Sequence, residues 1–196
     1  MDFVRPARQM SLSLVSGRGH YATVISRALS ARRSVWIATA NLKELMVEDP
    51  RLVPGRARSG RRRFRSVLEV FDELAADSVD VRILHAALPS RAFRDRFDSL
   101  PRLVSGAIAL RMCQRVHLKT VIVDARVLYL GSANWTGAGL GAKGEGRRNF
   151  ELGFLTEDEE LMDEVQAVFD HLWRGGECAG CRLRDGCDMP LVGLSR

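Results

Sequence analysis

Residues 116–136 carry the sequence VHLKTVIVDARVLYLGSANWT, and the spacing within this stretch decides both fold and site. His117, Lys119 and Asp124 stand as H-x-K-x4-D, and six residues separate Asp124 from the Gly-Ser-Ala-Asn run at 131–134. Because residues i and i+2 of a strand point to the same side, we expect His117 and Lys119 to project together from a strand over 116–123.

Two further polar pairs follow the same i, i+2 spacing. Ser132 and Asn134 follow the next predicted strand, and Asn149 and Glu151 stand at the start of another. Three neighbouring segments therefore offer polar pairs to what we expect to be one pocket. A neutral imidazole is a nucleophile near neutral pH, while lysine and asparagine can donate to phosphoryl oxygens. The set suits attack on a phosphate.

Asp124 differs from the other members of this set. It lies an odd number of residues from His117, so an unbroken strand would direct it to the opposite face. We therefore expect Asp124 to hold structure and not to touch substrate.

The surrounding sequence alternates helical and strand patterns. Helices are expected over 19–31, 66–76, 90–98 and 157–173, and strands over 34–40, 79–84, 107–112, 116–123, 126–130 and 150–155. Ser66 with Glu69 three residues later forms a capping-box pattern. The predicted class is α/β, or mixed α+β, with a central mixed sheet flanked by helices and a short Cys-rich appendage. We divide the chain into an N-terminal arm (1–18), whose first dozen residues we expect to be loose, one domain (19–173) and a Cys-rich tail (174–196).

The stretch HLKTVIVDARVLYLGSANWT resembles the H-K-D signature of the phospholipase D superfamily, and the downstream NFELG resembles its Asn-x-Glu element. The resemblance implies phosphodiester hydrolysis or exchange through a phosphohistidine, with no metal cofactor in catalysis. It implies that His117 is the nucleophile and that Glu151 orients it. It also implies that the phosphate is bound by Lys119, Ser132 and Asn134. The candidate catalytic set is thus His117, Lys119, Asp124, Ser132, Asn134 and Glu151.

The chain carries a single such motif, because neither His20, His85 nor His171 is followed by x-Lys. The superfamily builds one site from two motifs. The resemblance therefore implies a homodimer with a site across its twofold axis, in which the second histidine acts as general acid.

The net charge of +6 is concentrated in arginine, which supplies 27 of the 30 basic residues. Seven arginines and no acidic residue lie within 51–65, a loop pattern that is typical either of a solvated segment or of a surface that binds nucleic-acid backbone. The candidate nucleic-acid contacts are Arg56, Arg58, Arg61, Arg62, Arg63, Arg65, Arg147, Arg148 and Trp135, the last as a base-stacking or a core residue.

Cys178, Cys181 and Cys187 follow the last predicted helix as C-x2-C-x5-C. Three cysteines within ten residues favour a structural metal site, with Cys113 or His171 as the fourth ligand. His171 would suit zinc, whereas Cys113 would give a four-thiolate site for zinc or an iron–sulfur cluster. The spacing after one distant upstream cysteine also resembles the iron–sulfur clasp of Cas4- and AddB-type nucleases.

The composition excludes collagen-like, disordered and membrane-spanning classes, and no signal-peptide pattern is present, which predicts a cytoplasmic protein without membrane insertion. The leading hypothesis is a metal-independent endonuclease acting on DNA or RNA. The alternatives are a phospholipase D-type lipid hydrolase or transferase, and a nucleic-acid-binding subunit of a larger defence or repair complex with weak catalysis.

Overall fold

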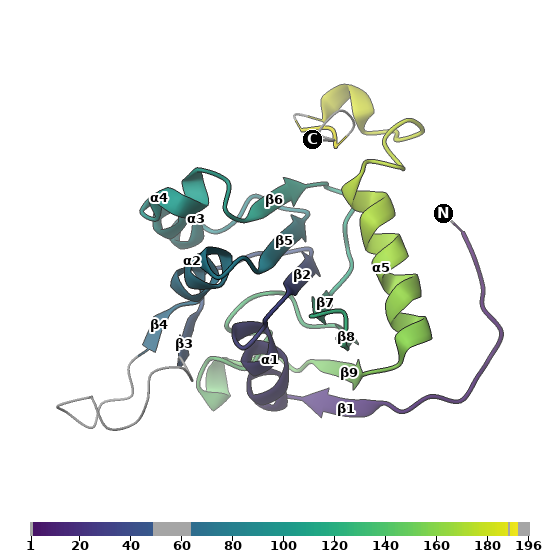
Figure 1. The fold of residues 1–196 in the computed structure, drawn as a ribbon, viewed down its shortest axis with the longest axis horizontal. Helices are drawn as coiled ribbons and strands as arrows, with labels where there is room; N and C mark the ends of the chain where they lie inside the picture. The colour runs from purple at the N-terminus through teal and green to yellow at the C-terminus, as the bar shows by residue number, and fades with distance from the viewer. Residues whose placement is uncertain (1, 49–63, 188, 192–196) are drawn as a thin grey trace.

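A seven-stranded mixed sheet forms the centre of the protein (Figure 1). The computed structural model describes residues 2–48, 64–187 and 189–191. The strand order is β1-β9-β8-β7-β2-β5-β6, with β2, β5 and β6 parallel and the remaining pairs antiparallel. The strands are β1 (Ser13–Ser16), β2 (Ser34–Thr39), β5 (Asp80–His85), β6 (Ala109–Met112), β7 (Thr120–Val123), β8 (Val127–Gly131) and β9 (Leu152–Thr156); β3 (Met46–Glu48) and β4 (Phe64–Ser66) form a separate antiparallel pair.

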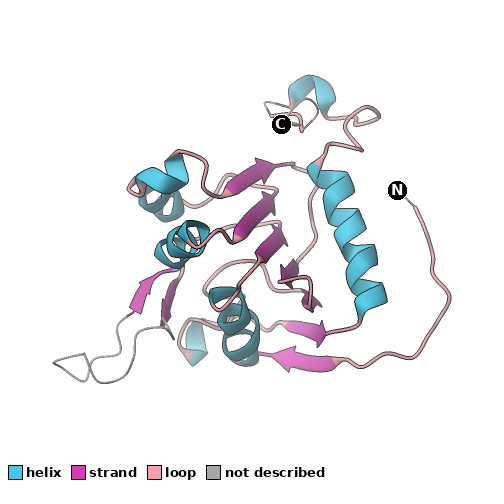
Figure 2. Cartoon of the chain, viewed as in Figure 1, coloured by secondary structure: helices cyan, strands magenta, loops and turns pink. Residues whose placement is uncertain are grey.

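Helices cover both faces of this sheet (Figure 2). The long helix α5 (Glu159–Trp173) lies on one face, and the shorter helices lie on the other. These are η1 (Tyr21–Ile25), which is a π-helix continued by α1 (Ser26–Leu29), then α2 (Val67–Ala76), α3 (Arg91–Asp98) and α4 (Pro101–Val104); the short 3₁₀ turns η2 (Glu145–Arg147) and η3 (Arg184–Gly186) lie in loops. The predicted fold class is confirmed.

Side chains alternate between the two faces of the sheet and so form two separate apolar cores. On β2, Val35 and Ile37 pack into the core shared with α1 and α2, whereas Trp36 and Ala38 face the side of α5. The Trp36 and Phe169 rings stack with centroids 5.3 Å apart. Because both faces of β2 are buried, its sequence SVWIAT is apolar throughout its interior, as expected for a central strand.

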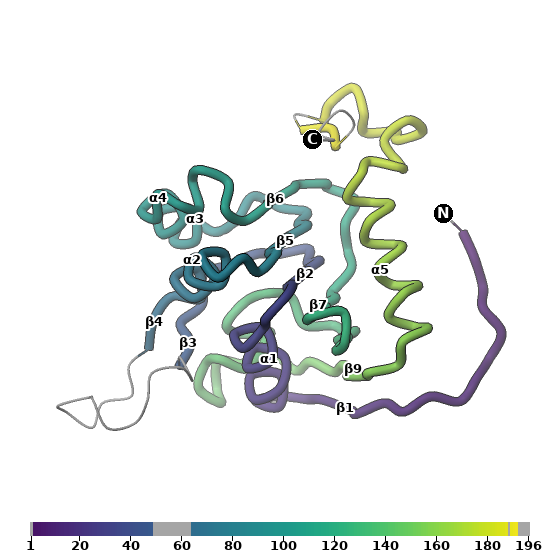
Figure 3. Tube along the Cα trace, in the orientation of Figure 1, coloured from purple at the N-terminus to yellow at the C-terminus, as the bar shows by residue number. Residues whose placement is uncertain are grey.

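The end of the predicted N-terminal arm forms a strand, which the sequence did not predict. Residues Ser13–Ser16 form β1, which pairs antiparallel with β9, so β1 lies beside β9 along the tube in Figure 3. Arg8 donates from Nη1 to Asp158 Oδ2 at 2.8 Å, and Arg8 is the main reason that the pKa of Asp158 falls to about 2. The error arose because four residues that alternate weakly give no strand signal until their partner strand is known.

The hairpin between β7 and β8 is fixed by Asp124. This residue adopts a left-handed conformation (φ 56°), as does Ala125 (φ 50°). The Asp124 carboxylate accepts hydrogen bonds from the backbone N–H groups of Arg32, Arg33 and Ser34, with Oδ1 at 3.0, 2.6 and 3.0 Å. Asp124 therefore ties the hairpin to the chain that enters β2, at the end of β7 away from His117.

We expect Asp124→Ala to lower the free energy of unfolding by about 1–3 kcal/mol, because three N–H groups lose a charged acceptor. Urea denaturation measures the change. Ala125→Gly in the same turn is the matched control, since glycine adopts a positive φ without strain, and it should not destabilise the protein. Equal stability of wild type and Asp124→Ala would contradict the anchoring role.

Candidate active site

The polar pairs predicted from the sequence meet at one edge of the sheet. β7 begins after His117 and Lys119, β8 ends just before Ser132, and β9 begins just after Glu151. Since β8 runs antiparallel to both neighbours, the start of β7, the end of β8 and the start of β9 lie at the same edge. The backbone N–H of Gly131 donates to the Lys119 carbonyl at 3.1 Å, which fixes the first two segments side by side.

His117 and Lys119 lie in the extended segment that leads into β7, not within the strand as predicted. The Lys119 Nζ atom lies 3.0 Å from both ring nitrogens of His117 and 2.9 Å from the His117 carbonyl oxygen. Only one nitrogen of a neutral imidazole can accept a hydrogen bond. The tautomer of His117 therefore decides which ring nitrogen accepts from the Lys119 ammonium. The His117 side chain is exposed, which leaves its ring open to a substrate.

Glu151 is engaged with Ser132 and Asn149. Ser132 Oγ donates a short hydrogen bond to Glu151 Oε2 and accepts from the Leu152 backbone N–H at 3.1 Å. Asn149 Nδ2 donates to Glu151 Oε1 at 3.1 Å. Among the described residues Glu151 makes no hydrogen bond to His117, so the expected orienting contact is absent in this conformation.

Asn134 connects the site to β2. Its Oδ1 atom accepts from the backbone N–H groups of Ala40 and Asn41 at 3.1 and 3.0 Å, and Thr39 Oγ1 lies 3.3 Å away. Thr39 Oγ1 in turn accepts from the backbone N–H of Trp135 at 2.9 Å. Because the amide oxygen is occupied by the backbone, the Asn134 NH₂ group is left to donate to a ligand.

Two opposing effects act on the Lys119 ammonium. Burial lowers the pKa of Lys119, and the Glu151 carboxylate opposes that shift. The site thus combines an exposed imidazole, an ammonium, an amide donor and a hydroxyl–carboxylate pair. These groups can hold a tetrahedral oxyanion such as a phosphate beside a nucleophilic nitrogen.

The predicted nucleic-acid contacts have different outcomes. Arg56, Arg58, Arg61, Arg62 and Arg63 lie outside the described residues. Arg65 Nε donates to Glu69 Oε2 at 3.0 Å and its Nη2 to Glu73 Oε1 at 2.6 Å, so its guanidinium is engaged within the protein. Arg147 is exposed and Arg148 is half-buried, both beside the site in the segment before Asn149.

Trp135 is a core residue, which corrects the base-stacking alternative. It is 1% exposed and packs against Phe71, with ring centroids 5.9 Å apart. The strand period that exposes Ser132 and leaves Asn134 accessible places Ala133 and Trp135 on the inner side.

The four cysteines are half-buried and unbridged. Cys113 and Cys178 pack against the same apolar cluster, which contains Ala38, Leu84, Val116, Phe169 and Trp173. The Leu183 backbone and Arg115 lower the pKa of Cys181. His171 Nε2 lies 2.8 Å from Glu177 Oε1. Within the described residues, no three His, Cys, Asp or Glu side chains are arranged to hold a metal ion.

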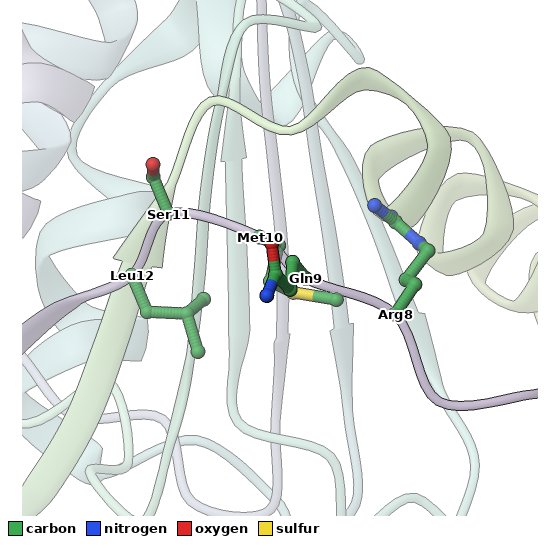
Figure 4. Close-up of a pocket in the computed structure, with 5 residues that line it drawn as sticks. All are labelled: Arg8, Gln9, Met10, Ser11 and Leu12. Carbon is green, nitrogen blue, oxygen red and sulfur yellow. The ribbon is translucent and has the colours of Figure 1, made fainter.

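An open hollow of about 630 Å³ lies along the N-terminal segment (Figure 4). Arg8, Gln9, Met10, Ser11 and Leu12 line it, and none belongs to the candidate site. In the part of the chain that the structure describes, no helix has the length and apolar character needed to cross a membrane.

Sequence reasoning missed the layer beneath the site. His20 and Tyr129 are fully buried next to each other, and both lie within electrostatic reach of Glu151. Glycines opposite Tyr129, at 131 and 153, were the one signal of a large inward ring, because a Cβ at either position would overlap Tyr129.

Comparison with known families agrees with this geometry. Residues 24–173 match a family described as "Cardiolipin synthase, PLD-like domain". The chain belongs to the phospholipase D-like family. Comparison with curated protein sequences found no significant match. Members of the phospholipase D superfamily hydrolyse or exchange phosphodiesters, so the shared chemistry of this phospholipase D-like protein is phosphodiester chemistry.

Solved structures share the fold. NucT from Helicobacter pylori aligns with a TM-score of 0.56 at 18% identity, covering 83% of this chain and 94% of its own. Nuc from Salmonella typhimurium, a phospholipase D family member, gives 0.55 at 18% identity, with 84% and 95% covered. Phosphatidylserine synthase from Haemophilus influenzae gives 0.51 at 16% identity, with 83% of this chain and 38% of that one covered.

Asn134→Asp tests whether the side-chain oxygen of Asn134 serves stability while its NH₂ group binds phosphate. The carboxylate retains an oxygen for the Ala40 and Asn41 N–H groups, so we expect stability to change by less than about 1 kcal/mol. It replaces the NH₂ donor by a negative oxygen, so affinity for inorganic phosphate should fall at least about tenfold. Titration calorimetry measures the affinity. Asn134→Ala, which loses both functions, should fail in both assays; phosphate binding by Asn134→Asp at the wild-type level would contradict the assignment.

Proposed function

We propose that this phospholipase D-like protein is a metal-independent phosphodiesterase that cleaves DNA or RNA through a phosphohistidine at His117. The observation that carries the proposal is the meeting of His117, Lys119, Ser132, Asn134 and Glu151 at one sheet edge. Family membership supports the phosphodiester chemistry. The nucleic-acid substrate is supported by the six arginines within 51–63 and by Arg147 and Arg148 in the segment before Asn149.

The reaction requires two groups, a nucleophile that attacks phosphorus and an acid that protonates the leaving oxygen. In the first step an imidazole nitrogen of His117 attacks phosphorus, the bond to the leaving oxygen breaks, and that oxygen takes a proton from an acid. In the second step water attacks phosphorus, the N–P bond breaks, and the former acid accepts the water proton. Lys119 and the Asn134 NH₂ group neutralise the charge on the phosphoryl oxygens in both steps.

The acid is proposed to come from a second copy of the chain. None of His20, His85 and His171 is both exposed and beside His117: His20 and His85 are buried, and His171 lies on α5 beside Glu177. His117 of the partner subunit would serve as the acid if two copies associate about a twofold axis. The working unit is therefore a homodimer, which is also compatible with a larger defence or repair complex.

His117→Ala should reduce cleavage of plasmid and single-stranded DNA or RNA in EDTA by about 10³-fold or more, because it removes the attacking atom. Arg94→Ala on exposed α3 is the control and should retain activity. Undiminished cleavage by His117→Ala would contradict the mechanism. Light scattering on the wild type should give the mass of a dimer, and a monomer with full activity would contradict the shared site.

A lipid substrate is the second candidate, favoured by the description of the matching family as a cardiolipin synthase domain. Release or exchange of head groups from liposomes, with no cleavage of nucleic acid, would support it. Tight nucleic-acid binding by the wild type without turnover would instead support the binding-subunit alternative.

We also propose that the cysteines of the tail hold a structural zinc ion or iron–sulfur cluster, with Cys113 as fourth ligand. Cys113 shares the apolar cluster with Cys178, and Arg115, two residues from Cys113, interacts with Cys181. His171 is instead engaged with Glu177. Because the described side chains are not already in ligating positions, binding would require the tail to close on Cys113.

Metal analysis and absorption near 400 nm on the purified protein test this site. We expect about one zinc ion per chain or the absorption of a cluster. Cys113→Ser should lose the metal and His171→Ala should retain it. Metal-free wild-type protein, or loss of metal only in His171→Ala, would contradict the assignment.

A further inference from the structure

His20 is a buried titratable group that the proposed mechanism does not use. It immediately precedes η1 and is 0% exposed. Its Nδ1 atom lies 3.2 Å from the Gly17 carbonyl oxygen, so Nδ1 carries the proton and donates it. Its Nε2 atom is buried and has no hydrogen-bond partner among the described residues.

Tyr129 lies directly against His20. The two rings meet edge to face, with centroids 5.5 Å apart and planes at 80°. The Tyr129 hydroxyl is likewise buried and makes no hydrogen bond of normal geometry in the described part of the chain, although the Ala133 backbone acts on it and lowers its pKa. Burial is the main reason that the pKa of Tyr129 rises to about 12. Two buried polar atoms without well-formed hydrogen bonds thus lie in one place, each costly to bury, which points to a role other than stability.

The Tyr129 ring supports the backbone of the candidate site. It fills the space over Gly131 and Gly153, which are direct partners across β8 and β9. Gly131 is followed by Ser132, and Gly153 shares a strand face with Glu151, two residues before it. A contact chain therefore runs from His20 through Tyr129 to the two segments that carry the Ser132–Glu151 hydrogen bond.

We propose that His20 and Tyr129 are positioning residues for the Ser132–Glu151 pair. The inference rests on the proposed function for its kinetic consequence, but not for the contact itself. The two rings fix the separation of the β8 end from the β9 start, and they present a neutral polar layer beneath the Glu151 carboxylate.

The charge on His20 follows from its surroundings. Burial lowers the pKa of His20, while the Gly17 carbonyl and the Glu151 carboxylate act in the opposite direction. The titratable groups that face it are Tyr129 from β8 and Glu151 from the segment just before β9, with the Arg148 guanidinium beside the Gly17 turn. Burial therefore favours the uncharged form of His20.

Tyr129→Phe and His20→Phe test the kinetic role. Both retain an aromatic ring. Tyr129→Phe removes only a hydroxyl without a well-formed hydrogen bond, so its urea midpoint should not fall, whereas His20→Phe also removes the Nδ1 hydrogen bond to the Gly17 carbonyl. With bis(p-nitrophenyl) phosphate as substrate, we expect kcat to fall about 10- to 100-fold, because each variant removes part of the neutral polar layer beneath Glu151 and small displacements of catalytic groups are costly. KM should change less than about twofold, because Lys119 and Asn134, which also hold the phosphate, are fixed by other contacts. His20→Gln, which keeps a donor and an acceptor, should recover part of kcat.

His85→Phe is the matched control. His85 is also a buried histidine with one backbone hydrogen bond, from Nδ1 to the Ala87 oxygen at 2.9 Å, but Glu151 does not influence its pKa. Its kcat per folded molecule should equal that of the wild type. Unchanged kcat in both Tyr129→Phe and His20→Phe, or an effect on KM alone, would overturn the proposal.

A titration that needs no turnover separates this inference from the proposed function. The His20 imidazole is titrated by NMR in the wild type and in Glu151→Gln. Because the Glu151 carboxylate raises the pKa of His20, its removal should lower that pKa further. An unchanged His20 titration would overturn the coupling. A responsive His20 in a protein that hydrolyses no phosphodiester would support the contact and contradict the proposed function.

Discussion

The antiparallel pairing of β7, β8 and β9 is the constraint on which the rest of the structure depends. It brings the start of β7, the end of β8 and the start of β9 to one edge, although His117 and Glu151 are 34 positions apart in the sequence. No single segment contains the site. A shift of register by one residue between β8 and β9 would turn Ser132 away from Glu151 and would also bury the wrong face of each strand.

The site residues also hold the fold together, and their atoms divide the two tasks. The Asn134 side-chain oxygen accepts hydrogen bonds from the chain that leaves β2, and its NH₂ group is available to donate to a ligand. Ser132 accepts from the β9 backbone through the same oxygen that donates to Glu151. The side chains are therefore held in place before a ligand arrives, which reduces the conformational entropy lost on binding.

The sequence was most informative where a local period carried the signal. The i, i+2 spacing located His117 with Lys119, and the odd offset of Asp124 predicted its anchoring role. The central strands and the longer helices were also found, within a few residues of their ends. Local patterns could not predict contacts made across the fold: the pairing of β1 with β9, the burial of Trp135 against Phe71, and the meeting of His20 with Tyr129. Glu151 was located, but its partners depend on where Asn149 and Ser132 arrive in space.

The pairing of β1 with β9 has a consequence for folding. Ser13 pairs with Leu155, so this contact closes a loop that spans most of the domain and forms slowly compared with local contacts. Until β1 docks, β9 presents an open strand edge, and its own residues Leu152 and Phe154 are exposed even in the folded protein. Open edges with apolar side chains pair readily with other chains. Docking of β1 therefore covers an edge of β9 through which incompletely folded chains would otherwise associate.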